Sequence, residues 1–238
     1  MKKIGIMQPY FFPYLGYYSL IKKTDLFILF DTVQFIRHGW IERNRILKPQ
    51  DSWQYIAAPL EKFNLGTKIQ DVKTRTNEDW QEKIIRQLDH YKKKSPFYHD
   101  TLAVIRESLK SEKTSITEIN KNILEKTCQY IGLTPKIHIY SEMDLKIEEV
   151  THPGEWALNI SKSMGATEYI NPTGGVEIFK RKQFDEAGIK LSFMGNNLPP
   201  YPQRRPTFEN GLSIIDVMMF NSPKDICEML DNVFFLNE

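Results

Sequence analysis

The chain has 238 residues, a length typical of one large α/β domain or of a domain that carries a sizeable insertion. Its 41% hydrophobic and 26% charged residues are sufficient for a folded core and exclude extensive disorder. The 32 Lys and Arg residues nearly balance the 30 Asp and Glu residues. The resulting net charge of +2 lacks the dense basic surface of a nucleic-acid binder, so no nucleic-acid partner is expected.

The amino terminus does not have the pattern of a targeting segment. Gln8, Pro9 and Pro13 interrupt its apolar stretch before it reaches the length of a signal peptide, about 7–15 residues. No stretch approaches the roughly 18 apolar residues that span a bilayer. Cys128 and Cys227 lie in apolar helical patterns, which predict buried thiols and no disulfide. We therefore expect a soluble, cytoplasmic protein without a membrane span.

Short apolar runs at residues 3–8 and 25–31 flank a helix-length segment at 15–23, which predicts a βαβ unit with two parallel strands. Further strands are predicted downstream, with helices between most of them. They lie at residues 53–58, 137–140, 168–170 and 189–193. We expect an α/β fold with a mostly parallel, Rossmann-like sheet that includes residues 3–8, 25–31, 53–58, 168–170 and 189–193.

Residues 77–132 contain three successive helical patterns without an intervening strand. Asn77 is the predicted N-cap of the first helix. Ser115 and Glu118 form a capping-box sequence for the third helix, which is predicted to end at Gly132. This stretch is expected to be a helical insertion or subdomain on an α/β core.

The α/β core is expected to comprise residues 1–76 and 133–238. Its last helix is predicted to begin after Ser222, with Pro223 at the first helical position. No internal repeat or low-complexity segment interrupts this organisation.

The first predicted strand leads into QPYFFPYLGYYSLI, residues 8–21. Loops at the carboxyl ends of parallel strands are common ligand sites in α/β proteins. Gln8, Tyr10, Tyr14 and Tyr17 are therefore candidate site residues. The alternative is that these aromatic residues only pack the helix onto the sheet.

This loop has the frame of the strand-to-helix loop of nucleotidylyltransferases and pantoate ligases, in which a His-x-Gly-His motif contacts ATP phosphates. Tyr14 and Tyr17 occupy the two histidine positions here, and Gly16 is retained. A phenol supplies no positive charge to a phosphate, so any ATP site is altered or lost. The cofactor therefore stays open, with ATP as one candidate.

The second predicted strand leads into FDTVQFIRHGWIERNRI, residues 30–46, which combines acidic, amide, guanidinium and indole groups. This composition indicates a recognition surface for a polar or anionic small molecule. The candidate site residues in it are Asp31, Gln34, Arg37, Trp40, Arg43 and Asn44. The alternative is a solvated charged loop with Trp40 packed inward.

Two downstream segments add candidates. In EYINPTGGVE, Tyr169 and Asn171 are expected at the same sheet end as Asp31, and Gly174 either approaches an anion or makes a turn before a helix at 176–187. Nearer the carboxyl terminus, Gln203 and the carboxylate of Asp216 are candidates for substrate contacts. The alternative for Asp216 is a pairing with a nearby arginine.

Several of these motifs together resemble the bacterial WbqC-like proteins over nearly the full chain. They are MQPYFFPYLGY, FDTVQF, GWIERNRI, NPTGG and LSIIDVMMFN. The family is associated with gene clusters for O-antigen and other surface polysaccharides. Its members are commonly described as glycine transferases that acylate an amino sugar, and the resemblance implies that activity for this chain.

Several enzyme classes are disfavoured by missing motifs. The five histidines have no metal-ligand spacing, so no metal site is predicted. The sequence has no GxSxG elbow, phosphate-binding P-loop or GxGxxG fingerprint, which disfavours a serine hydrolase, a P-loop enzyme or a dinucleotide dehydrogenase.

The leading hypothesis is an acyltransferase or ligase that acts on the amine of a nucleotide-linked amino sugar. Asp31 and Tyr14 are its predicted catalytic residues, with Asp31 orienting or deprotonating the amine. Arg37, Arg43 and Asn44 are expected to hold phosphate or carboxylate. The alternatives are a non-catalytic nucleotide or sugar-nucleotide binding protein and a nucleotidylyltransferase that works with tyrosines.

We expect the central candidates to line one concave pocket, since loops after adjacent parallel strands converge at one sheet edge. These candidates are Gln8, Tyr10, Tyr14, Asp31, Gln34, Arg43 and Asn44. The oligomeric state is not predicted.

Overall fold

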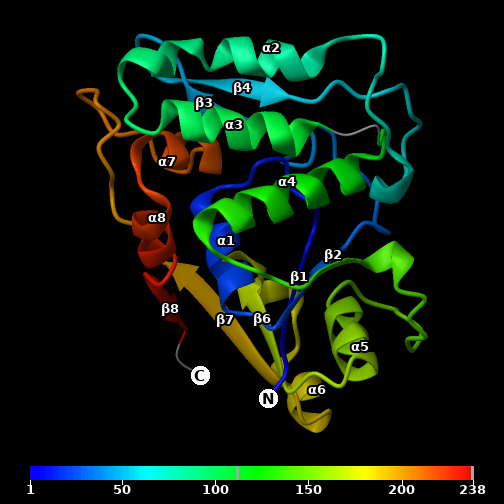
Figure 1. Cartoon of the computed structure of the whole chain (residues 1–238). Coiled ribbons are helices and arrows are strands. Elements are labelled where there is room, and N and C mark those ends of the chain that lie inside the picture. The colour runs from blue at the N-terminus through cyan, green and yellow to red at the C-terminus, as the bar shows by residue number, and fades with distance from the viewer. Residues whose placement is uncertain (111–112, 237–238) are drawn as a thin grey trace.

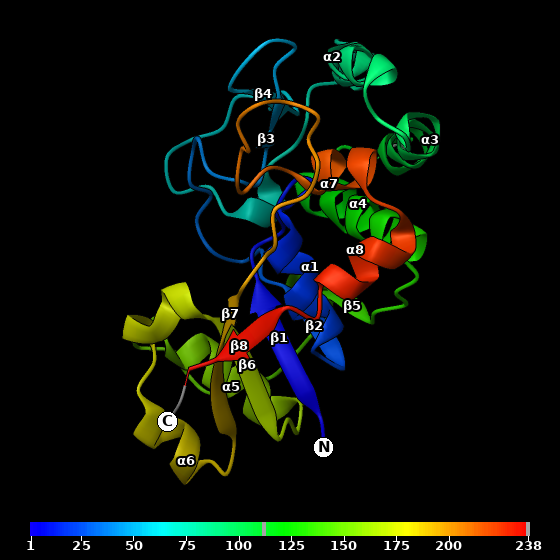
Figure 2. The same cartoon turned by 90° about the vertical axis from the view of Figure 1, so that its left-hand side faces the viewer.

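The computed structural model describes residues 1–110 and 113–236 of a mixed α/β protein. Its central six-stranded sheet has the order β5-β2-β1-β6-β7-β8 (Figure 1 and Figure 2). The strands are β1 (Lys3–Met7), β2 (Leu26–Leu29), β5 (Ile137–Ile139), β6 (Glu168–Pro172), β7 (Lys190–Asn196) and β8 (Val233–Phe235). Neighbours from β5 to β7 pair in parallel, whereas β8 pairs antiparallel with β7. The sheet is therefore mostly parallel, as predicted.

The predicted βαβ unit is confirmed. β1 and β2 are parallel neighbours, with Ile4 opposite Leu26 and Ile6 opposite Ile28, and α1 (Leu15–Lys22) connects them. The strands read as continuous apolar runs because helices cover both faces of the sheet. The strand predictions at 137–140, 168–170 and 189–193 are also confirmed.

Alternate residues of the inner strands contribute to two hydrophobic clusters. Ile28 joins α5 (Glu155–Ser163) and Phe184 of α6 (Arg181–Glu186) on one face. Phe27 joins the cluster on the other face, which also includes α1, α4 (Ile116–Ile131) and α7 (Ile214–Phe220). Figure 2 shows α5 and α6 on one side of the sheet, opposite α4 and α8 (Pro223–Met229).

The prediction that residues 53–58 join the central sheet is wrong. β4 (Trp53–Ala57) pairs antiparallel with β3 (Arg43–Leu47) in a separate two-stranded sheet. Asn44, Ile46 and Ile56 lie on its buried face, whereas Arg43, Arg45 and Tyr55 lie on the more exposed face. Alternation of buried and exposed residues is typical of a hairpin with one solvated side. The short apolar run at 53–58 does not by itself show whether the strand belongs to such a hairpin or to the central sheet.

The middle segment is helical, with α2 (Trp80–Gln87), η2 (Asp89–Lys93), α3 (Tyr98–Leu109) and α4. The N-cap of α2 is Asp79, whose carboxylate accepts a hydrogen bond from the Glu82 backbone N–H, and not the predicted Asn77. Ser115 caps α4, and Gly132 ends it at φ 87°. The division into two domains stays a prediction, and these helices share a hydrophobic cluster with α1 and α7.

The carboxyl-terminal third differs from prediction at one helix. Residues 176–187 do not form a continuous helix, because the turn η4 (Thr173–Ile178) ends before α6 begins. Elsewhere in the chain, two further short turns are η1 (Ile69–Asp71) and η3 (Tyr140–Glu142).

The predicted start of the last helix is confirmed, since Ser222 and Asp225 form a capping box with Pro223 between them. Within the described ranges, no helix has the length and apolar character needed to cross a membrane.

Candidate functional site

The loop between β1 and α1, residues 8–14, is called the opening loop. Its backbone carbonyls accept hydrogen bonds from buried side chains of distant elements, because a buried carbonyl without a partner is costly. Asn44 Nδ2 donates to the carbonyls of Phe11 (3.1 Å) and Phe12 (2.9 Å). Asn120 Nδ2 of α4 donates to Pro9 (2.8 Å), and Ser213 Oγ donates to Phe12 (2.8 Å).

A cavity of about 730 Å³ opens at the carboxyl ends of β1, β2 and β6, beside the start of α5. We call it the sheet-end cleft. Its apolar walls are formed by Ile6, Met7, Phe30, Val33, Ile36, Val150, Pro153, Trp156, Ala157, Ile178 and Phe179. Its polar groups are Gln8, Tyr10, Gln34, Thr151, His152, Tyr169 and Asn171. This is the position at which open α/β sheets bind ligands.

The sheet-end cleft is lined by neutral groups. None of the described residues that line it is Lys, Arg, Asp or Glu. Burial raises the pKa of the Tyr10 phenol, with a smaller contribution from Tyr14, so the phenol carries no charge at neutral pH. His152 is the one histidine among the described residues that line the cleft.

The loop before α5 fixes the orientation of His152. The Glu155 carboxylate accepts hydrogen bonds from the backbone N–H groups of Thr151 and His152, which lowers its pKa. His152 Nδ1 accepts from the Gly154 N–H at 3.2 Å. A ring nitrogen that accepts carries no proton, so the neutral ring has its proton on Nε2. His152 is therefore a hydrogen-bond donor at the rim of the cleft.

Five sequence-predicted residues lie in the sheet-end cleft. They are Gln8, Tyr10, Gln34, Tyr169 and Asn171. The Tyr169 hydroxyl donates to Asn171 Oδ1 (2.8 Å), and Asn171 Nδ2 donates to the Pro172 carbonyl (2.8 Å). Gly175 leaves space for this amide, since a Cβ there would lie 2.2 Å from Asn171 Nδ2. The predicted Gly174 is exposed and has open space around it.

Asp31 is placed outside the lining of the sheet-end cleft. Its carboxylate accepts hydrogen bonds from the backbone N–H (3.1 Å) and hydroxyl (2.7 Å) of Ser141. Burial raises the pKa of Asp31, and the Ser141 hydrogen bonds oppose that rise. The contact joins the end of β2 to η3, so the structure gives Asp31 a role in holding two strand ends together.

The predicted phosphate-binding arginines are engaged within the protein. Arg37 donates to the Phe63 carbonyl, and its guanidinium lies 4.6 Å from the centre of the Phe63 ring. Arg43 donates to the carbonyls of His38 and Gly39 and lies 4.1 Å from the centre of the Tyr55 ring. Neither lines the sheet-end cleft.

Three other aromatic candidates also have structural partners. Trp40 lies 5.5 Å from the Arg45 guanidinium. Tyr17 is fully buried and donates to the Gln8 carbonyl (2.8 Å). Tyr14 is the N-cap residue of α1, and its ring lies so close to Gly16 that a Cβ there would meet it at 2.4 Å. The structure thus does not place all seven central candidates in one pocket, because Tyr14, Asp31, Arg43 and Asn44 lie outside the cleft.

Asp216 is the centre of a buried hydrogen-bond network. Its carboxylate accepts from the hydroxyls of Tyr91 and Tyr201, both at 2.6 Å, and from Gln203 Nε2 at 3.1 Å. Burial raises the pKa of Asp216 to about 6, and the three donors partly oppose that rise. Asp216 and Gln203 therefore connect the proline-rich loop before α7 to η2.

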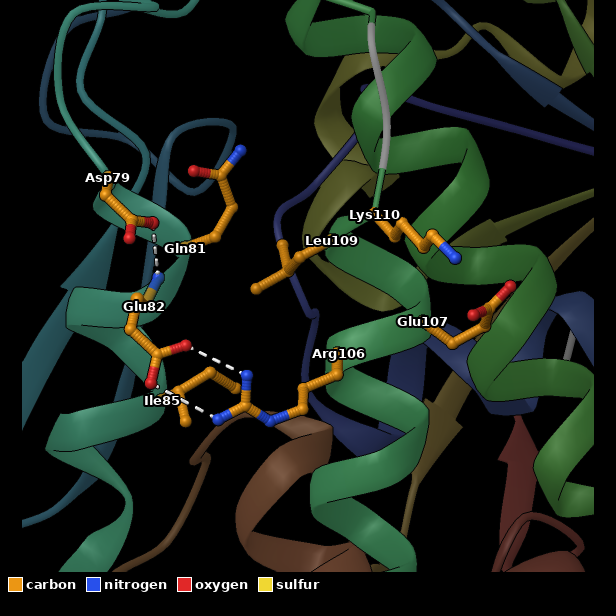
Figure 3. Close-up of a pocket in the computed structure, with 8 residues that line it drawn as sticks. All are labelled: Asp79, Gln81, Glu82, Ile85, Arg106, Glu107, Leu109 and Lys110. Carbon is orange, nitrogen blue, oxygen red and sulfur yellow. Dashed lines mark hydrogen bonds and ion pairs between the residues drawn. The ribbon is translucent and has the colours of Figure 1, made fainter.

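A second large cavity, of about 720 Å³, is the groove between α2 and α3 shown in Figure 3. Its charged walls contact each other, since both Arg106 terminal nitrogens donate to the Glu82 carboxylate (2.9 and 3.2 Å). Asp79 is the N-cap of α2. These residues already have partners, so we place no site in this groove.

The sequence prediction missed several residues of the sheet-end cleft. Phe30 immediately precedes the predicted Asp31, and Phe179 follows η4. His152 lies in the loop before α5 and Trp156 in the first turn of α5, and neither falls in a predicted strand. The Pro153-Gly154 pair just before a helix start is the sequence signal that could have identified this loop.

The described geometry defines a mixed α/β protein with a neutral, aromatic cleft at the carboxyl ends of its parallel strands. The chain belongs to the WbqC-like protein family, whose family model matches residues 8–228. The uncharacterized protein Rv1507c of Mycobacterium tuberculosis is 29% identical over 229 residues, which cover 93% of this chain and 94% of that relative. No solved structure matches the chain.

Proposed function

We propose that the protein transfers a glycyl or related acyl group to the amine of a nucleotide-linked amino sugar for surface polysaccharide. The observation that carries this proposal is the sheet-end cleft, where aromatic walls and uncharged polar groups face one cavity. Sugar rings stack their C–H faces on aromatic side chains and exchange hydrogen bonds with amides. The parallel β1–α1–β2 unit supports a Rossmann-like, nucleotidylyltransferase-like sheet as part of the same proposal.

The chemistry proposed for the cleft is acyl transfer by amine attack. The amine nitrogen attacks the carbonyl carbon of an activated acyl donor, the C–N bond forms, and the bond to the leaving group breaks. The nitrogen then loses its proton to solvent or to the departing group. A neutral, partly desolvated cleft favours the unprotonated amine, which is the nucleophile. In this proposal the Nε2–H of His152, whose Nδ1 accepts from the Gly154 N–H, donates to the developing oxyanion at the rim.

Substitution of Trp156 tests the binding half of the proposal. Trp156 lies 5.2 Å from Phe30, ring centre to ring centre, in the wall of the cleft. We expect Trp156→Ala to weaken binding of the amino sugar by about 10- to 100-fold, because one stacking wall is lost. Calorimetry with UDP- and dTDP-linked amino sugars measures this change. Trp40→Ala is the matched control, since Trp40 lies outside the cleft, and equal losses in both variants contradict the assignment.

A second function, sugar-nucleotide binding without catalysis, is favoured by one observation. Among the described residues that line the cleft, none supplies a carboxylate, thiol or amine to act as base or nucleophile. Incubation with glycyl adenylate and each nucleotide-linked amino sugar separates the two functions. Mass spectrometry of an N-glycyl sugar supports the transferase, whereas tight binding without any product supports the binding protein.

A further inference from the structure

We infer, resting on the proposed function, that the protein recognises its acceptor through the uncharged part of the amino sugar and not through the diphosphate of the carrier. The sheet-end cleft is large enough for a hexose, and its described lining contains no Lys or Arg. Moving a diphosphate from water into a cleft without a cation is unfavourable, because nothing replaces the interactions that it made with water. The carrier therefore stays outside the cleft, in solvent.

The arginines of residues 37–45, which follow the cleft residue Ile36 along the chain, make contacts within the protein. One terminal nitrogen of Arg37 donates to the Phe63 carbonyl, and two nitrogens of Arg43 donate to the carbonyls of His38 and Gly39. Arg45 lies between the rings of Trp40 and Trp53, at 5.5 and 5.1 Å, and donates to the Gly211 carbonyl. None of these three guanidinium groups lines the sheet-end cleft.

The groups that face the cleft are instead suited to hydroxyl and amine groups. The side-chain amides of Gln8 and Gln34 line it, and neither makes a hydrogen bond to another residue in the described part of the chain. Each amide offers one acceptor oxygen and two donor hydrogens. Ile36 and Ile178, which are 63% and 44% exposed, give the rim an apolar surface that fits a deoxy position better than a phosphate.

The inference is tested by comparing one sugar on different carriers by calorimetry. The probes are the methyl glycosides of glucosamine and of 4-amino-4,6-dideoxyglucose, their UDP- and dTDP-linked forms, and free UDP and dTDP. For the sugar that binds, we expect the methyl glycoside to have a dissociation constant within about fivefold of the nucleotide-linked form. We expect no competition from free UDP or dTDP, and no weakening when the salt concentration rises about tenfold.

Variants locate the recognition. Gln34→Ala is expected to weaken the glycoside and the nucleotide-linked form by the same factor, about 3- to 10-fold. Gln81→Ala, in the separate α2–α3 groove, is the matched control and leaves both unchanged. Lys180, which follows Phe179 and is exposed, is the nearest cation along the chain on that side. Lys180→Ala is expected to leave binding unchanged.

Different failures overturn different statements. A nucleotide-linked sugar that binds more than about fivefold tighter than its glycoside, with salt-sensitive affinity or competition by free UDP or dTDP, overturns the inference and leaves the proposed function standing. A selective loss of nucleotide-sugar affinity in Lys180→Ala also overturns the inference. If no amino sugar binds in either form, the proposed function itself fails.

Discussion

An Asn44→Asp variant is expected to lose about 3–5 kcal/mol of the free energy of unfolding. The wild-type amide is 3% exposed and donates to two carbonyls of the opening loop, those of Phe11 and Phe12. Aspartate offers no donor at neutral pH and brings a buried negative charge next to both oxygens. Chemical denaturation monitored by circular dichroism measures the loss.

The matched control for this substitution is Asn77→Asp, at an exposed position before α2. It is expected to change the free energy of unfolding by no more than about 0.5 kcal/mol. The pair also separates two roles for Asn44. If Asn44 binds substrate, the Asn44→Asp variant folds with normal stability and loses only ligand affinity. That result contradicts the role of Asn44 in holding the opening loop.

The stability of the wild-type protein is expected to depend on pH through Asp216. Burial raises its pKa to about 6 from an ordinary value of 3.8, so the folded protein holds this proton more tightly than the unfolded chain. The resulting stabilisation is complete below about pH 4 and is lost as pH rises through about 6. A gap of about two pH units corresponds to about 3 kcal/mol, a large share of a typical domain's stability.

Replacement of Asp216 by asparagine removes this titration while keeping a similar shape. From about pH 4 to pH 8 the wild-type protein is expected to lose about 3 kcal/mol of its free energy of unfolding, whereas Asp216→Asn lacks this loss. Relative to wild type, the variant therefore gains about 3 kcal/mol over this pH range. Denaturation at both pH values measures the shift. The exposed Asp185→Asn serves as control, and a difference that stays constant with pH contradicts the buried, proton-binding role.

Elements with both a buried pattern and a clear end signal were predictable from the sequence. β1 and β2 are continuous apolar runs, and their parallel pairing follows from the helix between them. α4 and α8 begin after serine residues, Ser115 and Ser222, whose side chains cap the first helical turn. The β3–β4 hairpin was not predictable in the same way, because an isolated five-residue run does not specify the strand with which it pairs.

The site was predictable only where its residues directly follow strands. Gln8 and Asn171 lie in the cleft because the ends of β1 and β6 are adjacent. Arg43 and Asn44 were expected there from loop composition, but they belong to β3, whose pairing with β4 directs them elsewhere. Trp156 lies in the first turn of α5, well past the end of the preceding strand, so only the tertiary fold brings it to the cleft.

The opening loop is held by side chains from β3, α4 and the start of α7, up to 201 residues away in the chain. Such non-local contacts form only after those elements have docked. We therefore expect the Phe11 amide, which donates to the Trp40 carbonyl, to exchange its hydrogen slowly. The segment before α5 is held instead by local hydrogen bonds among Thr151, His152, Gly154 and Glu155.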